Sequence, residues 1–436
     1  MTRCILHVGM NKTGSSAIQN TAAANRDRLL AEHDVEYLAG PANHSALGAL
    51  FVDDPLSIHA MHRLNGHRRE ATERWCVRER ARLHGAMTET GAAAFMISGE
   101  GLSTIGTPAV HRLRDTLRAA FDPVDVFIYV REPFGYAVSK AQQNVKAGIT
   151  FARIREANLV DPVAAPREAD GRFSPAVQPF YRQRIEPLRD AFGVDRVHVR
   201  AFEPSGFAGG DVVRDFFAWA AGIDLSPGDI APVRANESMD AGYVGVLEAV
   251  NRIEPPFRDG RRNLARARDL VAIAAGQPAR TPFAMPDFDF DRFAEVVAGD
   301  VAWLAEATHG RIAFDLDHPL RRAPPVPETD HSAVAAVLNA QALLAENNGV
   351  RMQVNRALAN LRGRAGDERK PTERVLQHLL RRCREPLFLL EAAALLKGAG
   401  APDLAGAALE RVEALTDEPA MMERVAATRE RVRARS

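Results

Sequence analysis

The sequence is poor in cysteine and lysine, and neither sign of charge predominates in it. Its three cysteines, Cys4, Cys76 and Cys383, are too few and too far apart for a disulfide framework or a zinc site. The 56 basic and 56 acidic residues cancel, so the chain as a whole does not attract nucleic acid or an anionic membrane. The composition therefore argues against a disulfide-stabilised scaffold and against a nucleic-acid partner.

Long apolar runs are also missing. The first run, residues 4–8, is far too short for the apolar region of a signal peptide, and no stretch approaches the ~20 residues of a transmembrane helix. The apolar content of 46% is normal for a folded globular protein. Together with the few cysteines, which suit a reducing compartment, these features predict a cytoplasmic protein without a transmembrane segment.

One of the five lysines lies inside a glycine-containing stretch, HVGMNKTGSS, at residues 7–16. Gly9 and Gly14 have the spacing of the G-x-x-x-x-G-K-[ST] loop that binds nucleotide triphosphates. Ser15 occupies the position of that loop's lysine, and Lys12 lies between the two glycines instead. Because the usual contact to the β- and γ-phosphates is lost, a triphosphate fits poorly.

Short apolar runs alternate with helical patterns through roughly the first 320 residues. Strands separated by helices form parallel sheets that are covered on both faces and bind ligands at the carboxyl ends of the strands. We therefore expect an α/β fold with a P-loop-like parallel sheet flanked by helices. The predicted strands are 4–8, 93–98, 124–130 and 196–202, and the predicted helices run from Ser15 or Ser16 to about Ala31, over 108–121, from about Pro133, and over 211–220.

A proline-rich segment, RRAPPVPETD, ends this part of the chain because its prolines cannot continue a helix or a strand interior. Beyond it the sequence reads as helix only, with apolar spacings over 331–348 and 352–361 that are typical of a coiled coil or a bundle. The last helical stretches resemble tetratricopeptide-type hairpins over at most one and a half units. The predicted domains are an α/β domain at 1–322, a linker at 323–330 and an all-α extension at 331–436.

The glycine stretch leads from a predicted strand into a predicted helix. Backbone N–H groups and the helix dipole at such a junction both favour a phosphate-sized anion. Thr13, Ser15 and Ser16 add hydroxyl donors, and Lys12 adds a positive charge. The stretch is therefore predicted to bind an anion.

A second polar group follows the strand at 124–130. That strand ends in Arg131, where a nucleotide triphosphatase often has an aspartate for magnesium, and Ser139 follows eight residues later on the next helix. A guanidinium is a fork for phosphate oxygens, so this group predicts a second phosphate.

The two groups together resemble the motifs of sulfotransferases that use 3′-phosphoadenosine 5′-phosphosulfate (PAPS), especially bacterial members similar to carbohydrate sulfotransferases. In that family the 5′-phosphosulfate loop reads P-K-[ST]-G-[ST]-[ST] or H-K-T-G-[ST]-[ST], and the 3′-phosphate motif is an arginine followed eight residues later by a serine. The resemblance covers roughly residues 1 to 320 and departs from the pattern at Asn11. The matching residues are Asn11, Lys12, Thr13, Gly14, Ser15 and Ser16 in the loop, and Arg131 and Ser139 in the second motif.

The resemblance implies a role for each motif. Lys12 would contact the oxygen that bridges phosphate and sulfate and stabilise the leaving phosphate, while Arg131 and Ser139 would hold the 3′-phosphate. No metal is expected, because the protein itself supplies the positive charge. Glu100 follows the strand at 93–98 and resembles the glutamate base of several carbohydrate sulfotransferases, with His44 as the next candidate and a surface or magnesium-binding glutamate as the alternative.

Two further stretches are assigned to binding. Arg234, in RANES at 234–238, is interpreted as part of a loop that closes over the nucleotide, with a helix N-cap as the alternative. The long irregular segment at 147–175 is predicted to recognise the acceptor.

The resemblance thus implies a sulfotransferase that moves a sulfuryl group from PAPS to a hydroxyl, with a carbohydrate or glycoconjugate as the expected acceptor and a lipid headgroup or small metabolite still open. Two alternatives stay open: a P-loop small-molecule kinase that uses ATP and magnesium, and a non-catalytic helical scaffold. Self-association or a protein partner through the C-terminal helices is also left open.

Overall fold

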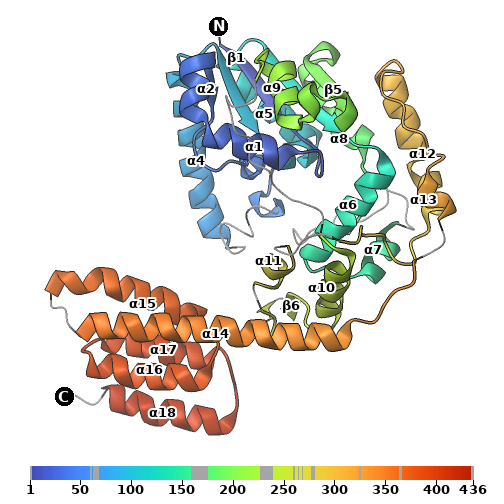
Figure 1. Cartoon of the computed structure of the whole chain (residues 1–436). Helices are drawn as coiled ribbons and strands as arrows, with labels where there is room; N and C mark the ends of the chain where they lie inside the picture. Colours follow the sequence, from blue (N-terminus) through green and yellow to red (C-terminus); the bar gives the residue numbers. More distant parts are fainter. Residues whose placement is uncertain are drawn as a thin grey trace. The chain divides into compact units, whose positions relative to one another are not determined.

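The computed structural model describes residues 2–58, 61, 68–158, 175–225, 239–258, 261–263, 265–267, 269–275, 280–323, 326–362 and 366–433 (Figure 1). The chain divides into two compact units. The first comprises Met1–Val244 and Pro278–Glu328, and the second comprises Gly245–Gln277 and Thr329–Ser436. Both units are therefore built from segments that are separated in the sequence.

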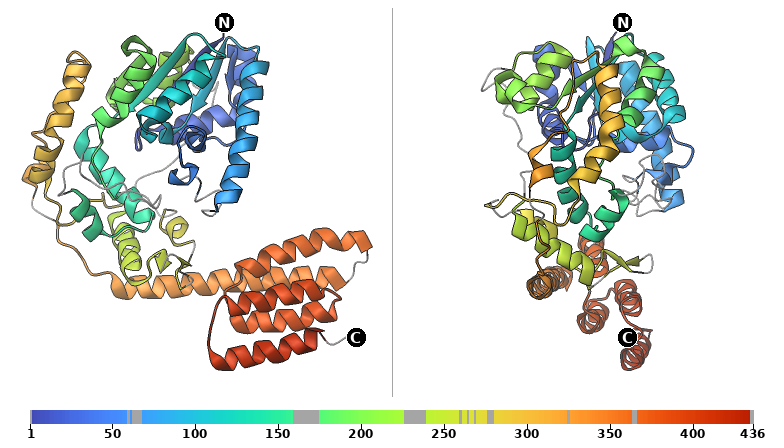
Figure 2. Two further views of the ribbon diagram at one scale, coloured as in Figure 1. Left: turned by 180° about the vertical axis from the view of Figure 1, so that it is seen from behind. Right: turned by 90° about the vertical axis from the view of Figure 1, so that its right-hand side faces the viewer.

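The first unit contains a five-stranded, all-parallel sheet in the order β2-β3-β1-β4-β5 (Figures 1 and 2). All seven residues of β4 are buried, as expected for a strand that is covered on both faces. The predicted α/β class with a parallel sheet flanked by helices is therefore confirmed. The strands are β1 (Arg3–His7), β2 (Val35–Tyr37), β3 (Ala94–Ser98), β4 (Val124–Val130) and β5 (Val197–Ala201).

Side chains alternate between the two faces of the sheet along each strand, so neighbouring residues of one strand contact helices on opposite faces. On one face, Ile5, Met96 and Phe127 pack into an apolar cluster with helices α1 (Ser15–Ala24) and α9 (Val212–Ala221). Phe95, which alternates with Met96, stacks on Phe121 just beyond helix α5 (Thr107–Arg118) on the opposite face. Helix α8 (Tyr181–Phe192) packs on α5 and contacts β4.

The remaining elements of the first unit connect or extend these layers. They are α2 (Arg26–His33), α4 (Arg69–Glu89), α6 (Pro133–Lys146), α7 (Phe151–Asn158), α12 (Phe290–Ala307), α13 (Pro319–Arg322), and the 3₁₀ helices η1 (Ser45–Leu50), η2 (Pro55–Ser57), η3 (Glu100–Thr104), η4 (Val194–Arg196), η5 (Pro204–Gly206) and η6 (Ala208–Gly210), while α10 (Ala241–Ile253) spans the boundary between the units.

The element boundaries predicted from the sequence agree to within about one residue for four strands, but the first helix differs. The expected continuous helix to about Ala31 is wrong, because it breaks at Asn25, whose φ is −119°. The Asn25 side-chain amide donates to the carbonyl of Thr21, a local bond that competes with helix continuation. Strand β2 was not predicted, since three residues are too short for a periodic pattern.

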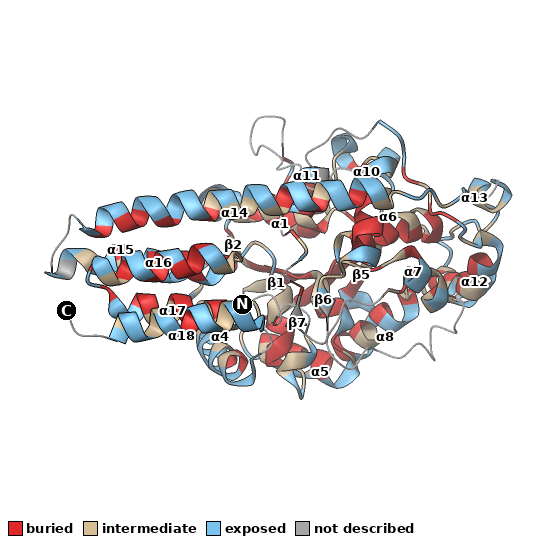
Figure 3. Ribbon diagram, turned by 90° about the horizontal axis from the view of Figure 1, so that it is seen from below, coloured by how far each residue is buried: buried red, intermediate tan, exposed pale blue. Residues whose placement is uncertain are grey.

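The second unit is mainly helical. Within the described residues beyond 330 the chain forms only helices, as predicted, and α14 continues through the two stretches that the sequence separated. Figure 3 shows buried residues interrupting a largely exposed surface along α14. The elements are β6 (Phe257–Arg258), β7 (Arg261–Arg262), α11 (Leu270–Ala275), α14 (Ser332–Arg362), η7 (Gly366–Arg369), α15 (Lys370–Arg382), α16 (Pro386–Gly398), α17 (Pro402–Glu413) and α18 (Pro419–Arg433).

Helix α14 binds the segment at 245–277 through a nearly buried asparagine. The Asn339 side chain accepts a hydrogen bond from the backbone N–H of Ala267 at 2.9 Å and donates one to the carbonyl of Ala265 at 2.7 Å. These bonds explain how a segment preceding α12 belongs to the same unit as the C-terminal helices.

Candidate functional site

The candidate site lies at the carboxyl ends of the strands, at the point where the order of the strands in the sheet reverses. The chain leaves β1 for β2 on one side of the sheet, whereas it leaves β4 for β5 on the other. Ligands of open α/β sheets bind at the carboxyl ends of strands at such a point. The segments that follow β1, β3 and β4 do meet here: the Asn11 amide donates to Glu100 Oε2 at 3.1 Å, and Arg131 Nη1 donates to the carbonyl of Lys12 at 3.3 Å.

The loop after β1 is held in an unusual backbone conformation. Lys12 has φ = +67° and Gly14 has φ = +75°, both in the left-handed region, which costs a non-glycine residue such as Lys12 of the order of 1 kcal/mol. A Cβ at Gly14 would lie 2.7 Å from Cγ1 of Val212, so only glycine fits there. Strain of this kind is typical of ligand-binding loops.

The loop presents a series of unused donors. In the described part of the chain, the backbone N–H groups of residues 12–16 have no hydrogen-bond acceptor. Gly14 is the N-cap of α1 and supplies no side chain to satisfy them. Consecutive free N–H groups at a helix N-terminus form a cradle for an anion.

The hydroxyl groups of the loop are used differently from the prediction. Thr13 and Ser15 are buried, and both donate to the carbonyl of Met10, at 2.7 Å and 3.0 Å. In this conformation the two hydroxyls stabilise the loop through their bonds to Met10 and are not free to donate to an anion. Ser16 is half-buried on the first turn of α1.

Lys12 lies beside Glu100, half-buried in the loop. Burial, together with repulsion from Lys146 and Arg131, lowers the pKa of Lys12 to about 8, and the Glu100 carboxylate opposes this. The ammonium group is therefore still mainly protonated at pH 7, and a bound anion would favour this charged form further.

Glu100 opens the 3₁₀ helix η3 directly after β3. Burial raises the pKa of its carboxyl group, while the neighbouring Ser15 hydroxyl and the positive charges of Lys12, Lys140 and Arg184 act in the opposite direction. A carboxyl group with a raised pKa in a cationic surrounding has the properties of a general base.

Arg131 lies at the end of β4, as predicted, with Phe202 beneath its guanidinium at 5.8 Å from the ring centroid. Burial lowers the pKa of Arg131, and the neighbouring Glu132 opposes this. Glu132 caps α6 by accepting from the backbone N–H groups of Phe134 and Gly135. Ser139 is half-buried in the same helix, and the structure records no direct contact between Ser139 and Arg131.

His44 is engaged on both ring nitrogens. Its Nδ1 accepts from the backbone N–H of Ser98 at 3.1 Å, and Nε2 lies 3.1 Å from the carbonyl of Leu38, which requires the neutral Nε2–H tautomer. Burial lowers the pKa of His44 to about 4. The geometry favours a structural role, in which this loop packs against Gly99, where a Cβ would lie 2.8 Å from the N atom of Ser45.

Two residues that the sequence analysis did not identify also belong to this group. Lys140 on α6 and Arg184 on α8 are 8% and 9% exposed, and both interact electrostatically with Glu100. A signal for Lys140 existed, since it directly follows Ser139 in a chain with five lysines. No signal marked Arg184, because arginine is common here and its position depends on how α8 packs.

We expect Lys140 to destabilise the ligand-free protein. Burial, followed by repulsion from Arg184 and Lys12, lowers its pKa from 10.5 to about 7. Between these pH values the unfolded chain binds the proton and the folded chain does not, so this penalty is complete below about pH 7 and disappears as the pH rises towards 10.5. Lys140→Met should therefore stabilise the protein by up to about 5 kcal/mol at pH 6 and by only about 1 kcal/mol at pH 10.

Urea unfolding of this variant at several pH values tests the expectation, with Lys370→Met on the exposed surface of α15 as the matched control. A Lys140→Met effect that does not change between pH 6 and pH 10 would show that the ammonium group is fully compensated by its surroundings.

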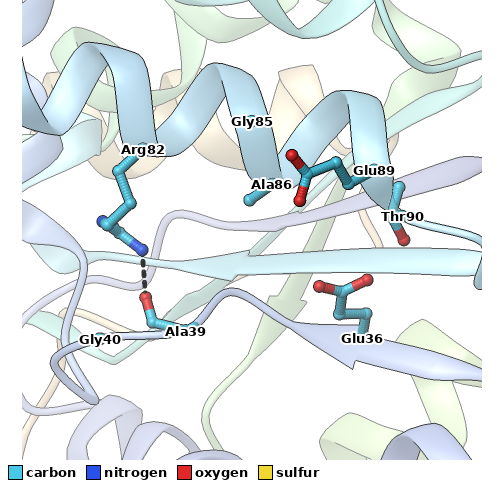
Figure 4. Close-up of a pocket in the computed structure, with 8 residues that line it drawn as sticks. All are labelled: Glu36, Ala39, Gly40, Arg82, Gly85, Ala86, Glu89 and Thr90. Atoms are coloured by element: carbon cyan, nitrogen blue, oxygen red, sulfur yellow. Dashed lines mark hydrogen bonds between the residues drawn. The ribbon is translucent and has the colours of Figure 1, made fainter.

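A separate hollow borders the edge strand β2. This cavity of about 590 Å³ is lined by Glu36, Ala39, Gly40, Arg82, Gly85, Ala86, Glu89 and Thr90. Figure 4 shows Arg82 bound to the carbonyl of Ala39, with the carboxylates of Glu36 and Glu89 bordering the hollow. None of these residues comes from the segments that follow β1, β3 or β4, so the cavity is distinct from the candidate site.

Other predicted binding residues lie outside the described residues. These are Arg234 with the rest of 234–238, and most of the acceptor segment, residues 159–174. Among the described ranges, no three His, Cys, Asp or Glu side chains are grouped closely enough to hold a metal ion. No helix in these ranges has the length and apolar character needed to cross a membrane.

The arrangement can therefore hold an anion on the N–H groups of residues 12–16, with an ammonium and a carboxylate beside it. Comparisons of the chain with protein-family models, with curated proteins and with solved structures find no match.

Proposed function

We propose that this protein is a sulfotransferase that uses PAPS and a P-loop-like cradle to sulfate a hydroxyl group, on a carbohydrate or glycoconjugate. The observation that carries the proposal is the cradle itself: unused N–H groups at 12–16, with Lys12 inside the loop and Glu100 bonded to the neighbouring Asn11. A lysine in the middle of the loop is suited to a short phosphosulfate, whereas a triphosphate requires the lysine after the second glycine.

The donor would bind along the carboxyl edge of the sheet. Its 5′-phosphosulfate would accept from the loop N–H groups, where the dipole of α1 adds to the attraction. Its 3′-phosphate would lie at Arg131 and Ser139, whose helix α6 begins at the end of β4. Arg234, which lies outside the described residues, is proposed to contact the nucleotide.

Transfer would then be a single displacement at sulfur. The acceptor oxygen forms a bond to sulfur as the bond from sulfur to the bridging oxygen breaks, and Glu100 takes the acceptor proton. The electron pair of the broken bond stays on the 5′-phosphate, where Lys12 stabilises the added charge. The products are the sulfated acceptor, 3′-phosphoadenosine 5′-phosphate and, once Glu100 releases it to water, one proton.

A kinase using ATP and magnesium is the second candidate, because Glu100 follows a strand and could be a metal ligand. Arg131 argues against it, since a guanidinium stands where such a site usually has an aspartate. A helical scaffold would account for the second unit but gives no reason for the anion cradle in the first.

The cysteines support the proposed cytoplasmic location. Cys4, Cys76 and Cys383 are all free and buried. Free thiols are the usual state in a reducing compartment.

The nucleotide product, 3′-phosphoadenosine 5′-phosphate, is expected to raise the melting temperature without magnesium. A ligand present at 100 times its Kd stabilises the folded state by about 2.7 kcal/mol. Differential scanning fluorimetry with and without a chelator measures the shift. Adenosine 5′-phosphate is the matched control ligand, because it lacks the 3′-phosphate that Arg131 is proposed to bind, and it should stabilise much less. Stabilisation by ATP and magnesium but not by the bisphosphate would favour the kinase instead.

A further inference from the structure

Arg184 connects α8 with the turn that carries Glu100. Its Nη1 donates to the Ser103 hydroxyl at 3.0 Å, and its Nε donates to the carbonyl of Pro179 at 3.0 Å. The side chain is only 9% exposed, and its helix packs on η3. The guanidinium is therefore held on two sides and has one defined position.

Ser103 transmits this position to Glu100. The Ser103 hydroxyl donates to the backbone carbonyl of Glu100 at 3.0 Å, which closes the first turn of η3. The next residue is also held, because the N–H of Gly101 donates to the Ser45 hydroxyl at 2.8 Å. Arg184 thus holds the Glu100 turn through Ser103, while Asn11 donates to the Glu100 carboxylate from the loop.

The charge of Arg184 acts on the same carboxylate. The charged and polar groups that face Glu100 are Asn11 and Lys12 from the loop, Ser15 from α1, Tyr136 and Lys140 from α6, and Arg184 from α8. Burial raises the pKa of Glu100, and the positive charges oppose that rise. Lys12 and Lys140 have lowered pKa values of about 8 and about 7.

We propose that Arg184 is a positioning residue of this site, which fixes the Glu100 turn through Ser103 and favours the charged form of the Glu100 carboxylate. The inference rests on the proposed function, because it assigns Glu100 the work of a base. It requires no contact between Arg184 and the donor or acceptor.

Three variants separate the two effects. Arg184→Gln removes the positive charge. Arg184→Lys keeps the charge but loses the guanidinium group that bonds to both Ser103 and Pro179. Ser103→Ala keeps the charge and removes only the hydroxyl that links Arg184 to the carbonyl of Glu100. The assay is release of labelled sulfate from PAPS, with water in place of the acceptor, as a function of pH. Affinity for the bisphosphate is measured in parallel by calorimetry.

In Arg184→Gln the acidic limb of the kcat/KM profile should move to higher pH, because Glu100 is harder to ionise. The loss should be of the order of tenfold on that limb and smaller at high pH. Ser103→Ala and Arg184→Lys should lower the rate severalfold at every pH and leave the limb in place. Bisphosphate affinity should stay within about twofold of wild type in all three.

An unchanged acidic limb in a folded Arg184→Gln protein would overturn the electrostatic role, and a wild-type rate in Ser103→Ala would overturn the relay. If Arg184→Gln does not fold, carbon-13 NMR of labelled glutamate in the wild type tests the electrostatic role. The Glu100 signal, which is identified by its loss in Glu100→Gln, must be that of a carboxylate at pH 7. Failure of the proposed function is recognised separately, because the wild type would then neither bind the bisphosphate nor release sulfate.

Discussion

Lys12→Ala is expected to lower the rate of sulfuryl transfer by about 10²–10³-fold while the bisphosphate still binds. The ammonium group matters most when charge builds up on the leaving 5′-phosphate, and removing one such electrostatic contact typically costs that factor. The ground state should lose less, since by the proposed function the N–H groups of residues 12–16 and Arg131 would still bind the two phosphates. Labelled-sulfate release and calorimetry with the bisphosphate measure the two quantities.

Alanine is preferred to glycine as the replacement because Lys12 has a positive φ. Glycine adopts such a backbone freely and would also change the flexibility of the loop. Lys370→Ala, on the exposed surface of α15, removes a lysine far along the chain from the loop and should retain the wild-type rate. Loss of bisphosphate binding in Lys12→Ala together with an unchanged rate at saturation would assign Lys12 to ground-state binding only.

The meeting of the three loops of the candidate site could be predicted from the sequence because it depends on local patterns. The glycine spacing around Lys12 and the apolar runs before Glu100 and Arg131 are each visible within about ten residues. Parallel strands bring their carboxyl ends to one edge, so three separate loops had to converge once the strands were recognised. The bonds from Asn11 to Glu100 and from Arg131 to Lys12 are the consequence.

Details that depend on packing could not be predicted in this way. Thr13 and Ser15 were expected to face an anion, but their hydroxyls bond to Met10 inside the loop. A sequence gives the type of a side chain and not the direction it takes at a positive-φ turn. Arg184 reaches Ser103 only because α8 packs on η3, and those residues are separated by 81 positions.

The second unit shows the same limit. Periodic apolar residues predicted its helices well, since each helix buries one face against its neighbours. The segment at 245–277 joins them partly through polar bonds, such as those of Asn339 to Ala265 and Ala267, and such bonds have no periodic signature.

Glu100→Gln is expected to lower sulfuryl transfer by about 10²-fold or more and to leave bisphosphate affinity nearly unchanged. Glutamine keeps the size of the side chain, and its amide oxygen can still accept from Asn11, so the turn should keep its shape. The lost function is the acceptance of the acceptor proton. Because the rate then no longer depends on a carboxylate with a raised pKa, the acidic limb of the pH profile should also disappear.

Glu89→Gln, at the cavity beside β2, is the matched control and should transfer sulfate at the wild-type rate. Wild-type activity in Glu100→Gln would place the base elsewhere, and His44 would be a poor replacement, since using it would break its bonds to Ser98 and Leu38. Loss of bisphosphate binding in Glu100→Gln would instead assign the carboxylate to the nucleotide site. The residual rate of Glu100→Gln could instead fall as the pH is lowered, in parallel with the wild-type rate. The titrating group in the wild type would then not be Glu100, because the variant has no carboxyl group at that position to titrate.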